Sequence, residues 1–529
     1  MRFFSSLLSF GVGVSALLAQ TWSTYHGDNY NTGYAPGMGA MSMPTLRWAF
    51  NGGGRIWINS PVVGELDGDA NLEVVFGTYD NGTYYALHAE DGSLYWSYHL
   101  ATTQNFGSAV IGDVDGDGWN EVICPFESFD DDTKNQIVCL EHDGTLQWSF
   151  SDFWSGWFEA PCKLADVDGD GKLEVVTTSY LGMVYALNAE NGSRCWNVAK
   201  GTNCFSSPAI TPVSINGGST PDVIVTIYTP PDGGGLYALE GSNGAEIWSN
   251  PSAGYGYYTA PVIANITPDP SLEVIACNTE AGAVYCVNIE DGSLNWRYPA
   301  AGSIGDIGNT PAVGDLNGDG DNEIVFARDY WPTGTVFALN PDGTLFWSTN
   351  LPRITYSSAA ICDIDGDGKP EVLIGTISDT SLYCLNGEDG TILWSYPTRG
   401  AVVSSPVPVD VEHDGALGVL IGSTDYNLYL LDVKPVYGGS LEDETVRGQR
   451  LTATPSAGGI TVRFSLADPS PVSLELYDIS GALVSRVNLG EIGTGEHTRF
   501  IPTRKAGIFF LVLNTRSGSS STTCLIPER

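Results

Sequence analysis

Acidic side chains recur at fixed spacing in four short segments of the chain. Each segment reads Asp-x-Asp/Asn-x-Asp-Gly-x-x-Glu, which places side-chain oxygens at positions one, three, five and nine. Alternate positions of a tight loop can turn their oxygens inward, and Ca²⁺ prefers such a shell of hard oxygens. A solvated acidic turn is the alternative interpretation. The predicted calcium ligands are Asp113, Asp115, Asp117 and Glu121; Asp166, Asp168, Asp170 and Glu174; Asp315, Asn317, Asp319 and Glu323; and Asp363, Asp365, Asp367 and Glu371.

Other copies of the acidic segment are weaker. A possible fifth site, in which Ala70 replaces the turn glycine, comprises Glu65, Asp67, Asp69 and Glu73. Copies near residues 265–273 and 410–418 have lost part of the pattern, and they are not counted among the predicted calcium sites. Because one hairpin supplies all the ligands of a site, no coordination position is left open for catalysis. The sequence therefore predicts about four structural calcium ions, and no catalytic or cofactor-binding residue.

The acidic segments belong to a repeat of about fifty residues that occurs eight times. Each copy continues with an apolar run, a run like Tyr-Ala-Leu, Asp/Asn-Gly and a tryptophan. The runs are rich in Val, Ile, Tyr and Trp and show no sustained helical period, so four short strands are expected per copy. Such a unit is typical of one propeller blade, which predicts an all-β, eight-bladed β-propeller. The copies begin at Ser60, Ser108, Ala160, Ser207, Ala260, Thr310, Ser358 and Ser405.

A strand that is missing at one end of the repeats is present at the other. The last repeat stops after its third strand, at residues 428–433, whereas residues 45–48 resemble a fourth strand ahead of the first repeat. We expect this N-terminal strand to close the last blade, because closure removes open sheet edges. Each blade then carries one tryptophan, which we expect to pack between blades. These are Trp48, Trp96, Trp148, Trp196, Trp248, Trp296, Trp347 and Trp394.

The two ends of the chain differ from the repeats. Arg2 and the apolar run 3–18 predict a signal peptide over residues 1–19, and no other segment is long and apolar enough to span a membrane. An N-terminal extension follows at 20–44, then the propeller at 45–436. A Gly/Ser/acidic stretch at 437–450 is typical of a linker, and alternating apolar residues at 451–529 predict a small Ig-like β-sandwich.

The charge of the chain bears on its possible partners, and its cysteines bear on possible disulfides. The formal net charge of −39 leaves no basic surface to neutralise phosphates, so we expect no nucleic-acid partner. Cys139, Cys286 and Cys384 stand where other repeats carry alanine, and are expected to be small buried residues. Disulfides between Cys124 and Cys139, or between Cys277 and Cys286, remain open.

The repeats resemble two known families. The acidic loops followed by a β run are similar to the FG-GAP repeats of integrin-type propellers, and Tyr-Ala-Leu-x-x-x-x-Gly-x-x-x-Trp at 185–196 is similar to PQQ-type repeats. Residues 22–28 and 31–33 also resemble the opening of PQQ-like repeat proteins. That family includes quinoprotein dehydrogenases with a vicinal disulfide, whereas this chain has no Cys-Cys pair. Some polysaccharide lyases also use calcium-bearing eight-bladed propellers.

The last eighty or so residues resemble a different kind of module. Segments 476–484, 495–497 and 506–511 are similar to the C-terminal sorting domain of type IX secretion cargo. The resemblance implies handling by the secretion machinery and delivery to the surface of a Gram-negative bacterium. The final run, 522–529, departs from the sorting pattern, so plain secretion with a β-sandwich tail is the alternative.

The face opposite the acidic loops is the candidate ligand face. In a propeller the D-to-A and B-to-C connections emerge together, and here they are rich in aromatic residues, which stack on sugars or anchor protein partners. Capping of the blade ends is the alternative role. The candidates are Trp57, Trp154, Trp157, Tyr257, Tyr258 and Trp331.

Taken together, the sequence predicts a monomeric, secreted or surface-attached, calcium-stabilised propeller that binds a glycan or a protein without catalysis. The alternatives are a PQQ-dependent dehydrogenase and a calcium-dependent polysaccharide lyase.

Overall fold

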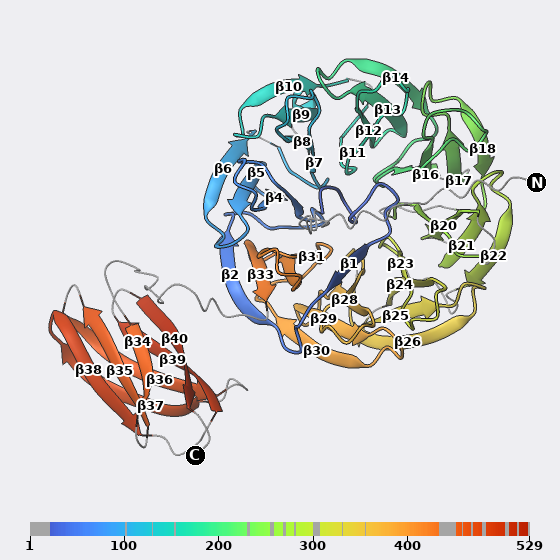
Figure 1. The fold of residues 1–529 in the computed structure, drawn as a ribbon. Coiled ribbons are helices and arrows are strands. Elements are labelled where there is room, and N and C mark those ends of the chain that lie inside the picture. Colours follow the sequence, from blue (N-terminus) through green and yellow to red (C-terminus); the bar gives the residue numbers. More distant parts are fainter. Residues whose placement is uncertain are drawn as a thin grey trace, which may run out of the picture. The chain divides into compact units, whose positions relative to one another are not determined.

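The chain folds into two compact units, one ending at Pro435 and one beginning at Val436. Figure 1 presents the computed structural model, and each unit is described by itself. The described residues are 22–100, 103–129, 131–152, 155–229, 233–253, 259–267, 271–279, 282–299, 307–330, 332–354, 356–432, 451–456, 459–466, 469–478, 483–502, 507–515 and 518–526.

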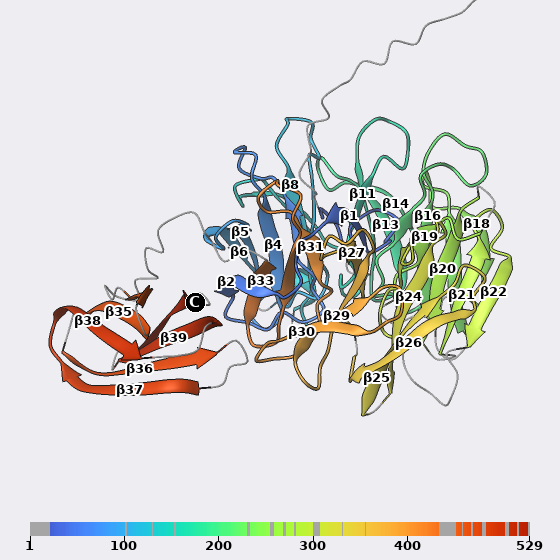
Figure 2. The ribbon, with the colours of Figure 1, turned by 60° about the horizontal axis from the view of Figure 1, so that its bottom comes forward.

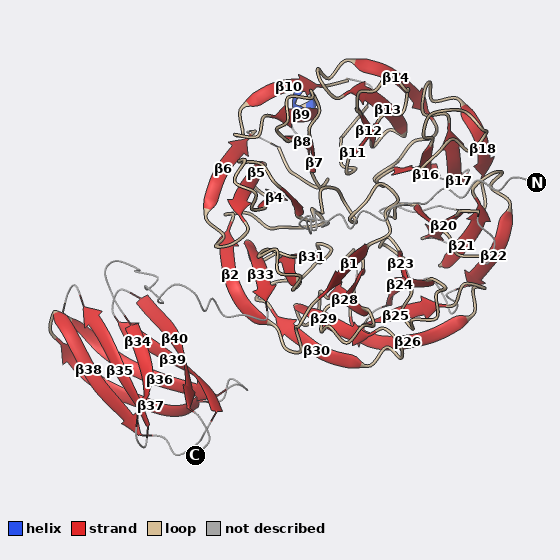
Figure 3. Ribbon diagram, viewed as in Figure 1, coloured by secondary structure: helices blue, strands red, loops and turns tan. Residues whose placement is uncertain are grey.

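Eight antiparallel sheets surround one axis in the first unit, each with its first strand innermost (Figures 1 and 3). Blade one is β3 (Val62–Gly64), β4 (Glu73–Thr78), β5 (Thr83–His88) and β6 (Leu94–His99). Blade two is β7 (Val110–Gly112), β8 (Glu121–Phe126), β9 (Gln136–Leu140) and β10 (Leu146–Phe150), with a short 3₁₀ turn at Asp132–Lys134. Blade three is β11 (Lys163–Ala165), β12 (Glu174–Thr178), β13 (Met183–Asn188) and β14 (Arg194–Ala199). Blade four is β15 (Ala209–Ile210), β16 (Val223–Thr229), β17 (Gly233–Leu239) and β18 (Glu246–Asn250).

The remaining blades follow the same order. Blade five is β19 (Val262–Ala264), β20 (Glu273–Asn278), β21 (Ala283–Asn288) and β22 (Leu294–Pro299). Blade six is β23 (Ala312–Gly314), β24 (Glu323–Tyr330), β25 (Thr333–Leu339) and β26 (Leu345–Pro352). Blade seven is β27 (Ala360–Asp363), β28 (Glu371–Gly375), β29 (Ser381–Asn386) and β30 (Ile392–Pro397). Blade eight is β31 (Val407–Val409), β32 (Gly418–Gly422), β33 (Asn427–Asp432) and β2 (Thr45–Asn51).

The last blade is closed by the N-terminal strand, as the sequence predicts. Strand β2 pairs antiparallel with β33, and Trp48 lies opposite Leu430. The closure extends to the inner strands, where the N–H of Ser405 in blade eight donates to Ser60 Oγ in blade one at 3.0 Å. The same bond links other neighbouring blade starts, for example Ser358 N–H to Ser405 Oγ at 3.2 Å. The hydroxyl that opens many repeats therefore joins one blade to the next.

The blade tryptophans dock on the turn between the third and fourth strands of the next blade. Seven of them donate their Nε1–H to a backbone carbonyl of that turn at 2.6–2.9 Å. Trp148, for example, bonds to Ala189 O, and a Cβ at Gly192 (φ +71°) would lie 2.5 Å from the Trp148 ring. Trp394 Nε1–H has no partner among the described residues, because blade eight takes its fourth strand from the N-terminus and lacks this turn.

The N-terminal extension runs across the propeller axis, a role that the sequence did not reveal. Its carbonyl oxygens accept hydrogen bonds at 2.8–3.0 Å from equivalent inner-strand amides of six blades. The pairs are Val63 to Trp22, Ile111 to Ser23, Ile210 to Asn29, Ile263 to Tyr30, Val313 to Thr32 and Ile361 to Gly33. The equivalent position in blade eight is Pro408, which has no N–H to donate.

In blade three a buried lysine replaces the backbone donor. Lys163 Nζ bonds to the carbonyls of Tyr25 and Asp28, and burial lowers the pKa of Lys163 to about 7. A neutral amine has two hydrogens, which match these two acceptors. The extension then continues as β1 (Tyr34–Met38), which pairs parallel with β27 inside blade seven.

The two disulfides that the sequence leaves open are not formed in the structure. Cys124 lies opposite Val138, whereas Cys139 lies opposite Ile123, so the two cysteines point to opposite faces of the sheet. Cys277 and Cys286 lie on one face of their sheet but are not directly opposed, because Cys277 lies opposite Val284 and Cys286 lies opposite Ile275. The nine cysteines whose side chains the structure describes, which exclude Cys524, are free thiols. In that part of the chain no helix is long and apolar enough to cross a membrane.

The second unit contains two sheets with one buried apolar cluster. One sheet is β34 (Leu451–Ser456), β35 (Gly459–Leu466) and β38 (Gly495–Pro502). The other is β37 (Leu483–Ile492), β36 (Ser470–Asp478), β39 (Gly507–Thr515) and β40 (Gly518–Ile526). Val462, Phe464, Leu474, Ile501 and Leu513 bring residues from both sheets into the cluster. An Ig-like assignment and a sorting role stay predictions.

Candidate functional site

The acidic loops join the first and second strands of their blades. In the four loops of the full pattern, the Asp at position one accepts backbone N–H bonds from positions four and six, at 2.7 Å and 2.9–3.1 Å. In blade three, for example, Asp166 accepts from Gly169 and Gly171. The backbone is thereby folded around the first carboxylate, and positions three, five and nine are brought close to it.

The glutamate at position nine is buried beneath each loop. Its Oε2 accepts the N–H of position two, as between Glu174 and Val167 at 3.0 Å. The other oxygen, Oε1, receives no hydrogen bond from the described residues in Glu121 or Glu174. Burial raises the pKa of Glu121, Glu174 and Glu323 to about 7 and that of Glu371 to about 8. A cation at this point would neutralise a buried charge and bond the free oxygen.

Several groups of loop side chains could hold a metal ion, because in each group one ligand atom per residue lies within 4.8 Å of the others. The groups in the predicted loops are Asp113, Asp115 and Glu121; Asp166, Asp168 and Asp170; Asp168, Glu174 and Cys195; and Asp363, Asp365 and Glu371. Blade six differs, because the Nδ2 amide of Asn317 lies 3.4 Å from Glu323 Oε1 and supplies a donor where the other loops present an oxygen.

Protein groups stand near the ninth-position carboxylate in two of the weaker loops. In blade one His88 Nδ1 lies 3.2 Å from Glu73 Oε1 and 3.6 Å from Asp67 Oδ2. In blade five Thr267 Oγ donates to Glu273 Oε1 at 2.8 Å. In both blades a side chain therefore lies beside the buried carboxylate, and in blade one Asp67, Glu73 and His88 together form a further group that could hold a metal ion.

Blade eight has no carboxylate at position nine, where Gly418 stands. Its loop is held instead by a buried guanidinium. Arg47 Nη1 lies 3.1 Å from Glu412 and 2.8 Å from Asp432. An arginine therefore neutralises acidic groups in this loop.

Partly exposed aromatic rings form two chains on the opposite face. Trp57 contacts Tyr79 (ring centroids 6.5 Å apart), which contacts Phe106 (4.8 Å). The second chain runs through Phe129, Trp157, Tyr180 and Phe205, with centroid distances of 4.6, 4.4 and 5.3 Å. The rings pack on one another and, apart from the buried Phe205, keep part of their surface exposed. Of the other candidates, Trp154, Tyr257, Tyr258 and Trp331 lie outside the described residues.

A fixed arginine borders the first aromatic chain. The Arg55 guanidinium carbon lies 4.9 Å from the Tyr79 ring centroid and 5.7 Å from that of Trp57. Arg55 Nη2 also bonds to Asp80 Oδ1 at 2.6 Å, and Nε bonds to the same carboxylate at 3.0 Å. The guanidinium is thus oriented before any ligand arrives.

One position of the repeat builds much of this face. It lies at or just beyond the end of the second strand, six residues after the ninth position of the loop, and its N–H donates to the D-to-A connection at 2.7–3.2 Å. The position carries Tyr79, Tyr180 and Tyr228 in blades one, three and four, but Glu127 in blade two. Sequence reasoning missed this position because its residue type changes from blade to blade.

Glu127 is paired with a second buried carboxyl group. Glu127 is fully buried and its carboxyl group interacts with that of Glu159, which is 5% exposed. Burial raises the pKa of both groups, and of Glu127 most.

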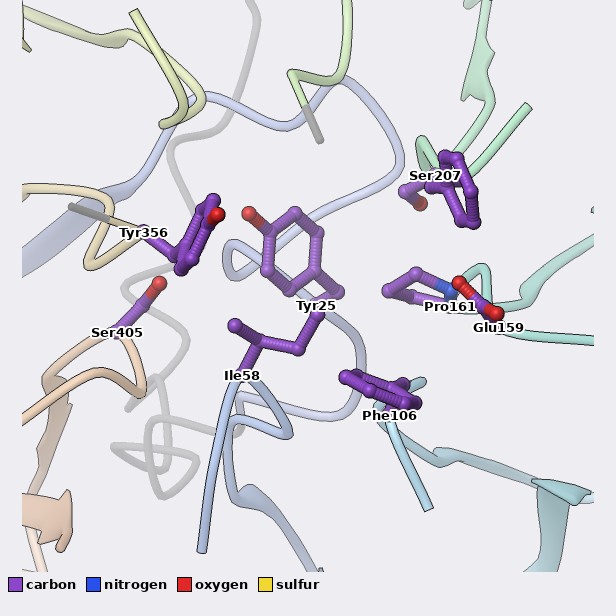
Figure 4. A pocket seen from close by; sticks show the side chains of 9 residues that line it. Tyr25, Ile58, Phe106, Glu159, Pro161, Ser207, Tyr356 and Ser405 are labelled. Carbon is purple, nitrogen blue, oxygen red and sulfur yellow. The ribbon is translucent and has the colours of Figure 1, made fainter. Parts of the chain in front are cut away.

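A small cavity lies at the axis beside this pair. Figure 4 shows Tyr25 of the N-terminal extension in the middle of it, between Tyr356 and Pro161, with Glu159 in the lining. Its volume is about 30 Å³, and Tyr25 Oη lies 3.0 Å from Thr310 Oγ1. The space suits about two water molecules and is far smaller than a sugar ring or a quinone cofactor.

Family models match separate parts of the propeller. The model described as the lambda-carrageenase beta-propeller domain matches residues 324–445. The model described as outer membrane protein assembly factor BamB, a PQQ-like repeat model, matches 127–329 and 180–367, and an FG-GAP-like repeat model matches 45–124.

Two curated proteins of Bacillus subtilis (strain 168) are similar over short regions. Rhamnogalacturonan endolyase YesW is 28% identical over 174 residues, and rhamnogalacturonan exolyase YesX is 32% identical over 89 residues. The matches cover 30% and 14% of this chain. The chain spans only 27% of the endolyase and 14% of the exolyase.

Solved structures share the architecture at low identity. A quinohemoprotein alcohol dehydrogenase from Comamonas testosteroni has a TM-score of 0.61 and 13% identity, covering 79% of this chain and 81% of its own. A europium-containing methanol dehydrogenase has a TM-score of 0.55 and 12% identity, covering 78% and 98%. At such identity the likeness concerns the fold alone. The chain is an eight-bladed β-propeller built from PQQ-like and FG-GAP-like repeats.

Proposed function

We propose that this protein binds a polysaccharide through the face formed by the D-to-A and B-to-C connections of blades one to four. The observation that carries the proposal is the pair of part-exposed aromatic chains on that face, one centred on Tyr79 and one on Trp157. Flat apolar rings with polar edges stack on sugar rings, and the fixed Arg55 beside Tyr79 adds a hydrogen-bond donor for hydroxyl or acidic groups.

The regional likenesses support a polysaccharide as the ligand. A carrageenase propeller model and two rhamnogalacturonan lyases match parts of the chain, and all three names refer to proteins that act on polysaccharides. Binding without cleavage is favoured by the geometry near the axis. The axial cavity, with a volume of about 30 Å³, is too small for a sugar ring.

The test is affinity for a panel of polysaccharides that includes rhamnogalacturonan and lambda-carrageenan. Trp157→Ala and Tyr79→Ala each lower affinity for the polysaccharide that binds. The matched control is Trp119→Ala, because Trp119 is 37% exposed but belongs to the blade-two acidic loop, where it stacks on His142 at 4.4 Å. Equal loss of affinity in the control, or no affinity in the wild type, contradicts the proposal.

Cleavage by a lyase is the second candidate, and the likeness to the two rhamnogalacturonan lyases favours it. The same incubation distinguishes the two functions. A lyase shortens the polymer and leaves a new carbon–carbon double bond that absorbs ultraviolet light, whereas a binding protein leaves the chain length unchanged.

Calcium in the acidic loops and export to the cell surface are parts of the same proposal. The buried, unbonded Oε1 atoms of Glu121 and Glu174 support calcium in blades two and three. Export is supported by the apolar run 3–18 and surface sorting by the pattern at 476–511. An N-terminus that retains residues 1–19 on the mature protein would contradict export.

A further inference from the structure

The Glu127–Glu159 pair is unlike the other buried glutamates of the propeller. At position nine of the loops, glutamates such as Glu174 and Glu323 bond to a backbone N–H. No N–H or O–H of the described residues reaches either carboxylate oxygen of Glu127, although the residue is fully buried. Buried polar groups without partners are rare in native proteins and call for a partner that is not part of the chain.

The side-chain oxygen of Gln104 projects from the same face of the sheet as Glu127. Gln104 and Glu127 are directly opposed in an antiparallel bridge, with N–H to O distances of 2.8 and 3.2 Å in the two directions. Opposed residues of such a pair project their side chains from the same face of the sheet. The buried Oε1 atom of Gln104 also receives no hydrogen bond from the described residues.

The described residues place no positively charged side chain beside the carboxyl groups of Glu127 and Glu159. In the described part of the chain, no Lys, Arg or His lies within ion-pair distance of Glu127 or Glu159. Buried carboxylates are normally paired with a cation or bound to a metal. Glu159 also lines the axial cavity of about 30 Å³, which has room for coordinated water.

We propose that Glu127, Glu159 and the side-chain oxygen of Gln104 bind a divalent cation of the calcium class, on the face opposite the acidic loops. The donors are all oxygens, two of them carboxylates, which is the ligand set that Ca²⁺ prefers, and waters in the cavity complete the shell. The site does not depend on polysaccharide binding.

The experiment counts the Ca²⁺ ions retained per full-length chain after removal of free ion. The double variant Glu127→Gln/Glu159→Gln keeps the side-chain shape, removes both charges and retains one ion fewer than the wild type. The matched control is Glu273→Gln, a glutamate that is also buried but whose two oxygens are bonded by Ile266 N–H and Thr267 Oγ. The control retains the wild-type number.

A second variant tests the proposal even if the double variant does not fold. Gln104→Glu adds a third carboxylate to the site and increases its Ca²⁺ affinity at least tenfold, as measured by displacement of Tb³⁺ luminescence. An unchanged ion count in the double variant, or an unchanged affinity in Gln104→Glu, overturns the proposal and leaves a pair of carboxyls that share a proton. Polysaccharide affinity is measured separately, so failure of the proposed function is distinguishable from failure of this site.

Discussion

The two faces of the propeller follow different rules. The face that carries the acidic loops, called the loop face below, repeats one hydrogen bond in seven blades. A carboxylate oxygen at position nine of the loop, or at its equivalent, accepts the N–H of position two. Glu174 accepts from Val167 in this way, and Asp222 accepts from Ile215. On the opposite face, equivalent positions carry different residues, such as Tyr79 and Glu127. The recurring contact holds the first and second strands of each blade to their loop, whereas the positions that vary between blades are the ones to which we assign ligand binding.

Removal of calcium is expected to have the largest effect, and it tests whether the loop face is a metal-stabilised scaffold. Each site stabilises the native state by about 2.7 kcal/mol when free Ca²⁺ exceeds its Kd about 100-fold. Loss of several sites therefore lowers the melting temperature markedly, and Ca²⁺ but not Mg²⁺ restores it. Calorimetry with and without a chelator measures the effect. An unchanged melting temperature would falsify the assignment of the loops as calcium sites.

The second prediction concerns the tryptophans that dock on the next blade, on the same face as the acidic loops. Trp148→Phe removes the hydrogen bond to Ala189 O and leaves a buried carbonyl unpaired, at a cost of about 1–3 kcal/mol. Trp394→Phe removes an N–H that has no partner among the described residues, and costs less. Melting temperatures of the two variants measure the difference. Equal destabilisation would mean that ring volume alone, and not docking on the turn, joins the blades.

On the opposite face the effect should appear in binding and not in stability. Trp157→Ala removes the ring that contacts both Phe129 and Tyr180, and should weaken polysaccharide binding by about 1–3 kcal/mol, the range measured for stacking on aromatic rings in nucleic-acid binding. Because the ring is partly exposed, the melting temperature should fall less than in Trp148→Phe. Titration calorimetry and thermal melting of the same samples separate the two quantities. A large loss of stability with unchanged affinity would make this ring a cap of the blade end.

How much the sequence predicts also differs between the faces. The repeat identifies the blades, the closing strand at Trp48 and the loop carboxylates, because each follows from a pattern that recurs along the chain. Glu127 and Glu159 could not be paired in this way, since they stand 32 positions apart and belong to no recurring motif. The axial path of the N-terminal extension was equally hidden, because its contacts use backbone carbonyls, which any residue type supplies.

The smallest expected change in stability concerns the acidic loop of blade one, where Ala70 replaces the turn glycine. Ala70 adopts φ +72°, where the equivalent Gly171 has φ +87°, and alanine in this left-handed region is strained by roughly 1–2 kcal/mol. Ala70→Gly should therefore stabilise the protein by about 1 kcal/mol, less the larger entropy that glycine gives the unfolded chain. The reciprocal variant, Gly171→Ala, should destabilise by a similar amount, since a Cβ there meets nothing within 4 Å and only the backbone is affected.

The count of bound Ca²⁺ in Ala70→Gly then shows which residue reduces calcium binding by the blade-one loop. If the glycine alone were missing, the variant would gain an ion. We expect no gain, because His88 Nδ1 still lies 3.2 Å from Glu73 Oε1, the oxygen that is free in Glu121 and Glu174. A gain of one ion in Ala70→Gly, with none in the double variant Ala70→Gly/Glu73→Gln, would show instead that the turn, and not the histidine, separates this loop from the others.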